Sequence, residues 1–214
     1  MRALPSPLLV VTDRHGHARP IVETVRAILK GGGRWIWFRD TDLEPEARRR
    51  LGASVAACVR AMHGVLTVGG DVALALALGA DGVHLGGGAG PEAIAAARAA
   101  LGEGARIGFS AHAPQEAAQA AAAGADYVTL SPIFPTASKP GYGPALGLDG
   151  LSAARAAGLP VVALGGIETG RIAECRAAGA NGVAVMGGLM RAADPAGAAR
   201  VLQDAWRAAA PLRS

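Results

Sequence analysis

The sequence predicts a single (β/α)₈ barrel. Short apolar runs alternate with alanine-rich amphipathic stretches along all 214 residues, and eight of each can be recognised. Strands that alternate with helices indicate a parallel sheet. Eight such units in about 200 residues reach the lower size limit of this barrel. A flavodoxin-like doubly wound sheet is the alternative, although it usually needs fewer strands.

The elements follow from the pattern in chain order. Each expected strand is an apolar run of four or five residues, rich in β-branched or aromatic side chains: Leu8-Val11, Trp35-Arg39, Val65-Val68, Gly82-Leu85, Arg106-Phe109, Tyr127-Leu130, Val161-Leu164 and Gly182-Met186. Each expected helix has helical apolar spacing and good helix formers, near 20–30, 44–61, 71–78, 91–101, 114–122, 149–157, 169–178 and 195–208.

One unit recurs three times where a helix ends and a strand begins. The versions are Gly-Ala-Asp-Gly-Val-His-Leu at 79–85, Gly-Ala-Asp-Tyr-Val-Thr-Leu at 124–130 and Gly-Ala-Asn-Gly-Val-Ala-Val at 179–185. The leading glycine suits the left-handed position after a helix, and the apolar run then enters the barrel. We interpret these repeats as structural and assign them no chemistry.

The composition limits the classes of function that the chain could have. With 51% hydrophobic and 18% charged residues, the chain fits one globular domain over 1–214. The formal charge of +4 is spread as single arginines, and only 4% of the residues are aromatic, so a nucleic-acid partner is not expected. The separated cysteines, Cys58 and Cys175, fit buried free thiols in a reducing compartment.

No membrane segment is expected. Residues 1–7 lack the pattern of a signal peptide, and the apolar run 72–78 is far shorter than the roughly 20 residues that span a bilayer. We therefore expect a cytoplasmic protein. Its alanine-rich outer helices are compatible with a homodimer as well as with a monomer.

Paired glycines follow the last two expected strands. In such a barrel, function lies on the loops after the strands, and the last two loops commonly hold a phosphate. Gly165-Gly166 and Gly187-Gly188 stand in these two loops, where glycine lets backbone N–H groups approach an anion. The sequence therefore predicts a phosphate site there, while a plain tight turn is the alternative.

Other polar candidates stand at the same mouth. His112 and Ser110 follow the fifth strand, and an imidazole in this position can exchange a proton near neutral pH, although it could also be an ordinary loop histidine. Arg39 ends the second strand and could clamp a carboxylate or phosphate, or pair structurally with an acid. His84, inside a strand, is expected to be packed and hydrogen-bonded. No cluster has zinc spacing, so a structural metal is not expected.

The segment 131–143 reads Ser-Pro-Ile-Phe-Pro-Thr-Ala-Ser-Lys-Pro-Gly-Tyr-Gly and follows a buried strand. It contains one of only two lysines, Lys139, against nineteen arginines. An ammonium is a compact charge suited to phosphate, although a solvated loop lysine is the alternative.

Together these stretches resemble the thiamine phosphate synthase superfamily, which includes the TenI-like thiazole tautomerases. The resemblance covers nearly the whole chain and is most specific at 79–86, 108–112, 131–139 and 163–167. It implies a barrel that binds a small thiazole phosphate, with the phosphate on the last two loops. It also implies that Thr136, Ser138 and Lys139 bind substrate and that His112 shuttles a proton.

The chain departs from the synthases of that family on the opposite side. They carry Gln-Leu-Arg-Glu-Lys where this chain has Trp-Phe-Arg-Asp-Thr at 37–41, and Asn-Asp where it has Gly69-Gly70. They carry Gln-Glu-Asp where it has Gly-Gly-Ala at 87–89. The resemblance implies that the two missing aspartates hold Mg²⁺ on a pyrimidine pyrophosphate, a role that needs carboxylate oxygens.

Three functions remain as hypotheses. The first is a TenI-like tautomerase that aromatises a thiazole carboxylate phosphate without a metal cofactor. The second is a divergent thiamine phosphate synthase, which would need replacement Mg²⁺ ligands such as Asp71 with Asp40 or Asp42. The third is a non-catalytic protein that binds thiazole phosphate.

Overall fold

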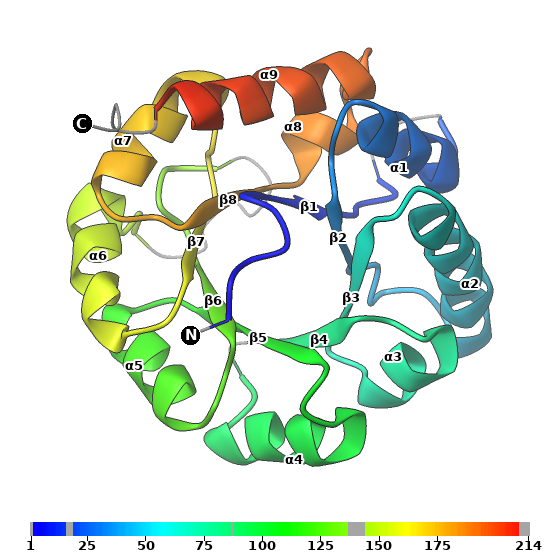
Figure 1. Ribbon diagram of the computed structural model, residues 1–214, viewed down its shortest axis with the longest axis horizontal. Coiled ribbons are helices and arrows are strands. Elements are labelled where there is room, and N and C mark those ends of the chain that lie inside the picture. Colours follow the sequence, from blue (N-terminus) through cyan, green and yellow to red (C-terminus); the bar gives the residue numbers. More distant parts are fainter. Residues whose placement is uncertain (1, 16–18, 87, 137–143, 210–214) are drawn as a thin grey trace.

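Eight parallel strands close into a barrel in the computed structural model, which describes residues 2–15, 19–86, 88–136 and 144–209. The strands follow one another in chain order, β8 pairs with β1, and the helices form a ring around the outside (Figure 1). The predicted (β/α)₈ barrel is confirmed. The doubly wound alternative is wrong, because an open sheet has two edges and this one has none.

The strands are β1 (Leu8–Val11), β2 (Trp35–Phe38), β3 (Val65–Gly69), β4 (Gly82–Leu85), β5 (Arg106–Ala111), β6 (Tyr127–Leu130), β7 (Val161–Leu164) and β8 (Gly182–Val185). The α-helices are α1 (Ile21–Lys30), α2 (Pro45–Ala61), α3 (Val72–Leu78), α4 (Pro91–Leu101), α5 (Pro114–Ala122), α6 (Gly147–Ala154), α7 (Ile172–Ala177), α8 (Gly187–Met190) and α9 (Pro195–Ala208). Two 3₁₀ turns, η1 (Arg155–Ala157) and η2 (Thr169–Arg171), adjoin α6 and α7.

One helix was not predicted. The short α8 lies between β8 and α9, where the sequence analysis expected only a glycine turn. Its four residues are too few to show a helical period, and glycine is a poor helix former. The expected helix at 195–208 is therefore α9, and it packs on α1 to complete the ring.

The three repeated units join neighbouring strands at the amino-terminal end of the barrel. The side chain of Asp81 accepts the N–H of Leu66 at 2.8 Å, while the N–H of Asp81 returns to the carbonyl of Leu66. Asp126 makes the same two bonds with Ile107, and Asn181 makes them with Val161. The repeats are thus structural, as interpreted, and the Asp/Asn position has a specific role in them.

Side chains of each strand alternate between two cores. Leu8 and Val10 of β1 face the helices, whereas Leu9 and Val11 face the barrel interior with Trp35, Trp37, Tyr127, Val162 and Ala184. Leu4 packs against this interior cluster, and the N-terminal segment crosses that end of the barrel (Figure 1). The interior is therefore filled by large side chains at its base, which leaves room only towards the mouth.

A polar network runs through this interior. Trp35 donates its indole N–H to Thr67 at 2.9 Å, and the Tyr127 hydroxyl lies 3.0 Å from Nδ1 of His84. Nε2 of His84 lies 3.0 Å from Ser110 Oγ and 3.2 Å from Thr129 Oγ1. Burial removes water from both titratable members, which raises the pKa of Tyr127 and lowers that of His84 to about 3. The expectation of a packed, hydrogen-bonded His84 is confirmed.

Both cysteines lie inside the fold. Cys58 and Cys175 are free and buried, and burial raises the pKa of the Cys175 thiol to about 11. Among the described residues no helix combines the length and the apolar character that crossing a bilayer requires.

The interior network depends on a glycine in β5. A methyl group at Gly108 would overlap the Tyr127 ring and lie 2.5 Å from His84 Nδ1. We expect Gly108→Ala to lower the free energy of unfolding by about 1–3 kcal/mol, because a packed core resists added volume. Chemical denaturation measures this. Gly104→Ala is the matched control, since no atom lies within 4 Å of that position; equal stability of both variants would contradict the packing.

His84 also predicts a pH dependence. Its pKa is about 3 in the folded chain against an ordinary 6.5, so between these values only the unfolded chain binds the proton. The free energy of unfolding should therefore fall as the pH drops below about 6.5, by at most about 1.4 kcal/mol per pH unit. His84→Gln should lose that slope. In NMR titration the His84 ring should keep its neutral signals from pH 8 to 5; a midpoint near 6 would show that the ring is not buried as described.

Candidate active site

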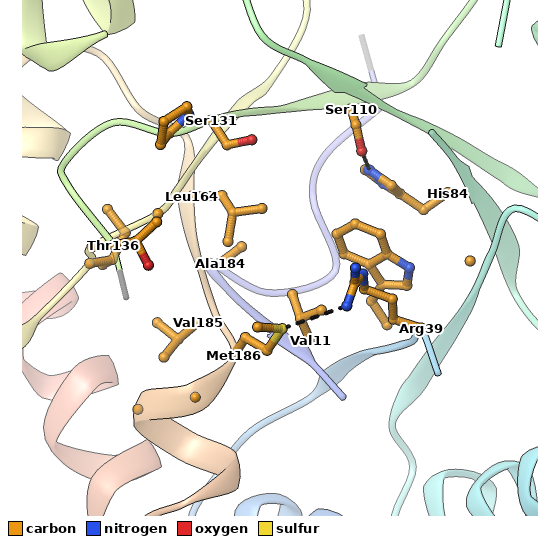
Figure 2. Close-up of a pocket in the computed structure, with 18 of the residues that line it drawn as sticks. Val11, Arg39, His84, Ser110, Ser131, Thr136, Leu164, Ala184, Val185 and Met186 are labelled. Atoms are coloured by element: carbon orange, nitrogen blue, oxygen red, sulfur yellow. Dashed lines mark hydrogen bonds between the residues drawn. The ribbon is translucent and has the colours of Figure 1, made fainter. Parts of the chain in front are cut away.

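A cavity of about 570 Å³ opens at the carboxyl ends of the strands (Figure 2). Residues at or just after the end of every strand line it, from Val11 of β1 to Gly188 after β8. The predicted site residues within the described segments all lie in its wall: Arg39, Ser110, His112, Thr136, Gly165, Gly166, Gly187 and Gly188. Ser138 and Lys139 lie outside the described residues.

The glycines after β7 are held tightly against the loop after β6. Gly165 and Gly166 have φ values of 95° and 65°, which favour glycine. A side chain at Gly165 would lie 2.9 Å from the Cα of Pro132, and one at Gly166 would lie 2.6 Å from the carbonyl oxygen of Pro135. The pair thus has a packing role in addition to the predicted phosphate role.

Backbone donors gather on this side of the cavity. Among the described residues, no backbone hydrogen bond uses the N–H groups of Gly165, Gly166, Gly187 or Gly188. Because all four glycines line the cavity, these donors suit an anion bound between β7 and β8.

His112 lies across from the glycine loops, at the end of β5. Its Nδ1 is 2.9 Å from the carbonyl oxygen of Ser131, and its backbone N–H donates to Glu116 at 2.7 Å. A carbonyl only accepts, so Nδ1 carries the hydrogen and Nε2 is the basic nitrogen of the neutral ring. The ring is therefore oriented by the β6 loop in a form that can take up a proton.

Arg39 reaches over the cavity from β2. Its backbone N–H donates to Thr12 Oγ1 at 2.9 Å, and Thr12 donates to the buried Asp40 at 2.5 Å. Its guanidinium extends towards Met186, with Nη1 4.0 Å from the sulfur (Figure 2). Among the described residues no carboxylate lies within ion-pair distance of the Arg39 side chain, so the alternative of a structural pairing with an acid has no support there.

The wall next to Arg39 is aromatic. Trp37 stacks on His84 with ring centroids 3.9 Å apart, and its buried indole N–H has no hydrogen-bond partner in the described structure. That nitrogen would lie 2.8 Å from a side chain at Gly69. The indole therefore occupies the space that a larger residue 69 would need.

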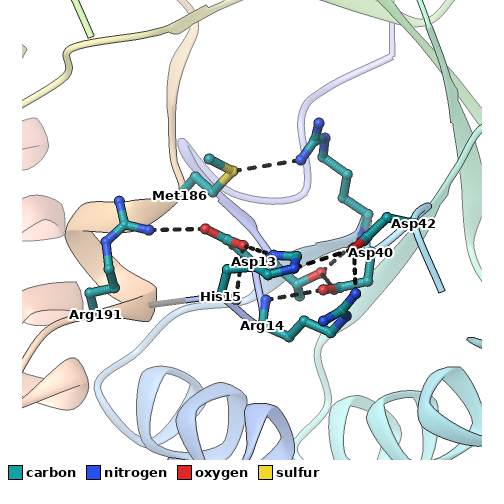
Figure 3. Close-up of polar contacts among 9 residues, drawn as sticks. Asp13, Arg14, His15, Asp40, Asp42, Met186 and Arg191 are labelled. Atoms are coloured by element: carbon teal, nitrogen blue, oxygen red, sulfur yellow. Dashed lines mark hydrogen bonds and ion pairs between the residues drawn. The ribbon is translucent and has the colours of Figure 1, made fainter. Parts of the chain in front are cut away.

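The acids proposed as Mg²⁺ ligands are already bonded elsewhere. Asp40 accepts from Thr12 and from the N–H of Arg14. Asp42 pairs with Arg14 and His15 (Figure 3). Asp71 caps α3 by accepting from Leu74 at 2.8 Å and pairs with the buried Arg48 at 3.1 Å.

The three acids are therefore engaged with other residues and do not form a ready-made carboxylate set for a divalent ion. Mg²⁺ normally takes one or two carboxylates together with water and substrate phosphates, and no group of three or more His, Cys, Asp or Glu converges in the described part of the chain. The segments outside the description contain no Asp or Glu. The one carboxylate among the described lining residues is Glu168, on the glycine side of the cavity.

Trp37 and Glu168 line the cavity but were not among the predicted site residues. Trp37 was noted only as a strand residue and as a departure from the synthases, although its two-residue spacing from Trp35 places both on the interior face. Glu168 follows Gly-Gly-Ile after β7, and its position in a functional loop was the signal that could have found it.

Comparisons with known proteins show a family. The profile of the family described as "Thiamine monophosphate synthase" matches residues 8–189. The chain is 40% identical to the "Putative thiamine-phosphate synthase" of Geobacter sulfurreducens, over 91% of this chain and 92% of that protein. It is 39% identical to the "Thiamine-phosphate synthase" of Moorella thermoacetica, over 92% and 93%.

A solved structure extends the likeness to three dimensions. The thiamine phosphate pyrophosphorylase of Pyrococcus furiosus superposes with a TM-score of 0.83 and 32% identity, over 94% of this chain and 96% of that one. The chain therefore belongs to the thiamine phosphate synthase family, a family of thiamine biosynthesis enzymes.

Proposed function

We propose that this enzyme binds a phosphorylated thiazole and moves a proton on it, without a metal ion held by its own carboxylates. The observation that carries the proposal is the wall formed by β2, β3 and β4. This wall presents Trp37, Gly69, Gly70 and Gly86 to the cavity, while Asp71 behind it is paired with Arg48. A pyrophosphate leaving group needs its charge neutralised, and this wall offers no ligand set for the Mg²⁺ that usually does so.

A proton shift needs only groups that the cavity contains. In a 1,3-prototropic shift a base takes a proton from one ring atom and returns it two atoms further on, so the formula and the redox state of the thiazole are unchanged. His112 presents Nε2 for this exchange while Nδ1 is bonded to Ser131. We assign the substrate phosphate to the N–H groups of the two glycine loops and a ring carboxylate to Arg39.

A second candidate is thiamine phosphate synthase, which joins the thiazole phosphate to a pyrimidine pyrophosphate. The names of the relatives favour it, because proteins about 40% identical over nine tenths of their length are called thiamine-phosphate synthases. The cavity of about 570 Å³ is also within the size range of sites that hold small ligands. This candidate requires Asp40, Asp42 or Asp71 to exchange their present partners for Mg²⁺.

The deciding experiment compares the two reactions in one preparation. With EDTA present, the purified protein should aromatise the thiazole carboxylate phosphate, and His112→Asn should lose about 10²–10⁴-fold in turnover because the proton acceptor is gone. The matched control is His63→Asn, at an exposed position outside the cavity with φ 52° that asparagine tolerates. Ring proton exchange measured by NMR is the readout.

Opposite results would replace the proposal. If thiamine phosphate and pyrophosphate form from both substrates with Mg²⁺, and EDTA stops this, the enzyme is a synthase. Tight binding of the thiazole phosphate without turnover in either assay would leave a non-catalytic binder.

A further inference from the structure

An arginine outside the predicted site lies directly against its last glycine loop. The guanidinium of Arg191 packs on Gly187, where a side chain would overlap Nη2 and lie 2.5 Å from Cζ. Gly187 lines the cavity. Because residue 187 has no side chain, the guanidinium of Arg191, which follows the last residue of α8, can lie against this loop.

The position of this guanidinium is set by a carboxylate on another strand. Nη1 of Arg191 donates to Asp13 Oδ2 at 2.9 Å, and Asp13 follows β1, the neighbour of β8 (Figure 3). Burial alone raises the pKa of Asp13, but hydrogen bonds from His15 and the charge of Arg191 outweigh it and leave that pKa below its usual value. Asp13 is thus a lasting anionic partner at neutral pH.

We propose that Arg191 is a further phosphate-binding residue and that Asp13 is its positioning residue. This rests on the proposed binding of a phosphorylated thiazole at the glycine loops. Asp13 contacts one side of the guanidinium, through Nη1. Nη2 lies over Gly187, next to the backbone N–H groups that suit the substrate phosphate. A guanidinium offers several donors in a fixed fork, so one carboxylate does not exhaust it.

A second arginine near the glycine loops is arranged differently. Arg171 donates to the carbonyl of Gly166 at 3.2 Å and its Cζ lies 4.3 Å from the Phe134 ring centre. Its Nη1 and its flat face are thus directed at the protein. Arg191 is instead held by one acid beside a glycine of the cavity wall, and for this reason we assign the phosphate contact to it.

The test separates phosphate recognition from folding. By calorimetry, Arg191→Gln should bind the thiazole phosphate on the order of tenfold more weakly, yet bind the same thiazole alcohol without phosphate as the wild type does. Arg191→Lys should recover part of the loss, since it keeps the charge without the fork. Asp13→Asn should weaken phosphate binding less than Arg191→Gln. Arg207→Gln, an exposed arginine of α9, controls for the change in net charge.

Inorganic phosphate provides a probe that is independent of the thiazole. If the wild type binds neither phosphate nor thiazole phosphate, both proposals fall. The wild type could instead bind inorganic phosphate but not the thiazole phosphate. If Arg191→Gln then weakens the binding of inorganic phosphate, the Arg191 assignment stands and the proposed thiazole function falls. Equal binding of the thiazole phosphate by wild type and Arg191→Gln overturns the assignment. So does an equal loss for the ligands with and without phosphate, which would mark Arg191 as a structural link only.

Discussion

The buried contact between Tyr127, His84 and Ser110 supports the floor of the cavity, and much of the site is arranged around it. The side chains of Tyr127 and His84 are buried, and their polar groups would be costly without a partner. Burial keeps the ring of His84 neutral, and its hydrogen bonds to Tyr127 and Ser110 hold it in place, so that Trp37 can pack on it. The hydroxyl of Ser110, which lines the cavity, is thereby engaged by the ring of His84 at the floor.

The fold was largely predictable because it is encoded by repetition. Alternating apolar runs and alanine-rich helices, with three versions of one junction, leave few arrangements other than a closed parallel sheet. The mouth positions followed from the same pattern, which is why His112 and the two glycine pairs were found in sequence and lie around one cavity. Their chemical roles remain predictions.

Pairwise contacts could not be predicted in this way. The sequence alone does not show that Asp71 forms an ion pair with Arg48 or that Trp37 fills the space beside Gly69. Nor does it show that the guanidinium of Arg191 packs on Gly187. These relations join residues that are distant along the chain or separated by a helical turn, and they depend on rotamers that only the folded packing selects. Helix α8 itself was missed for a related reason, since one helical turn carries no period.

The hydrogen bonds of Asp81, Asp126 and Asn181 have a further consequence for how such a scaffold diversifies. They fasten successive strands together at the end of the barrel remote from the cavity. The hydrogen bonds that join the strands and the residues that line the cavity therefore lie at opposite ends of the barrel. Substitutions at the mouth can accumulate without weakening the contacts at the other end. A chain built in this way can exchange one reaction for another while its architecture is inherited unchanged.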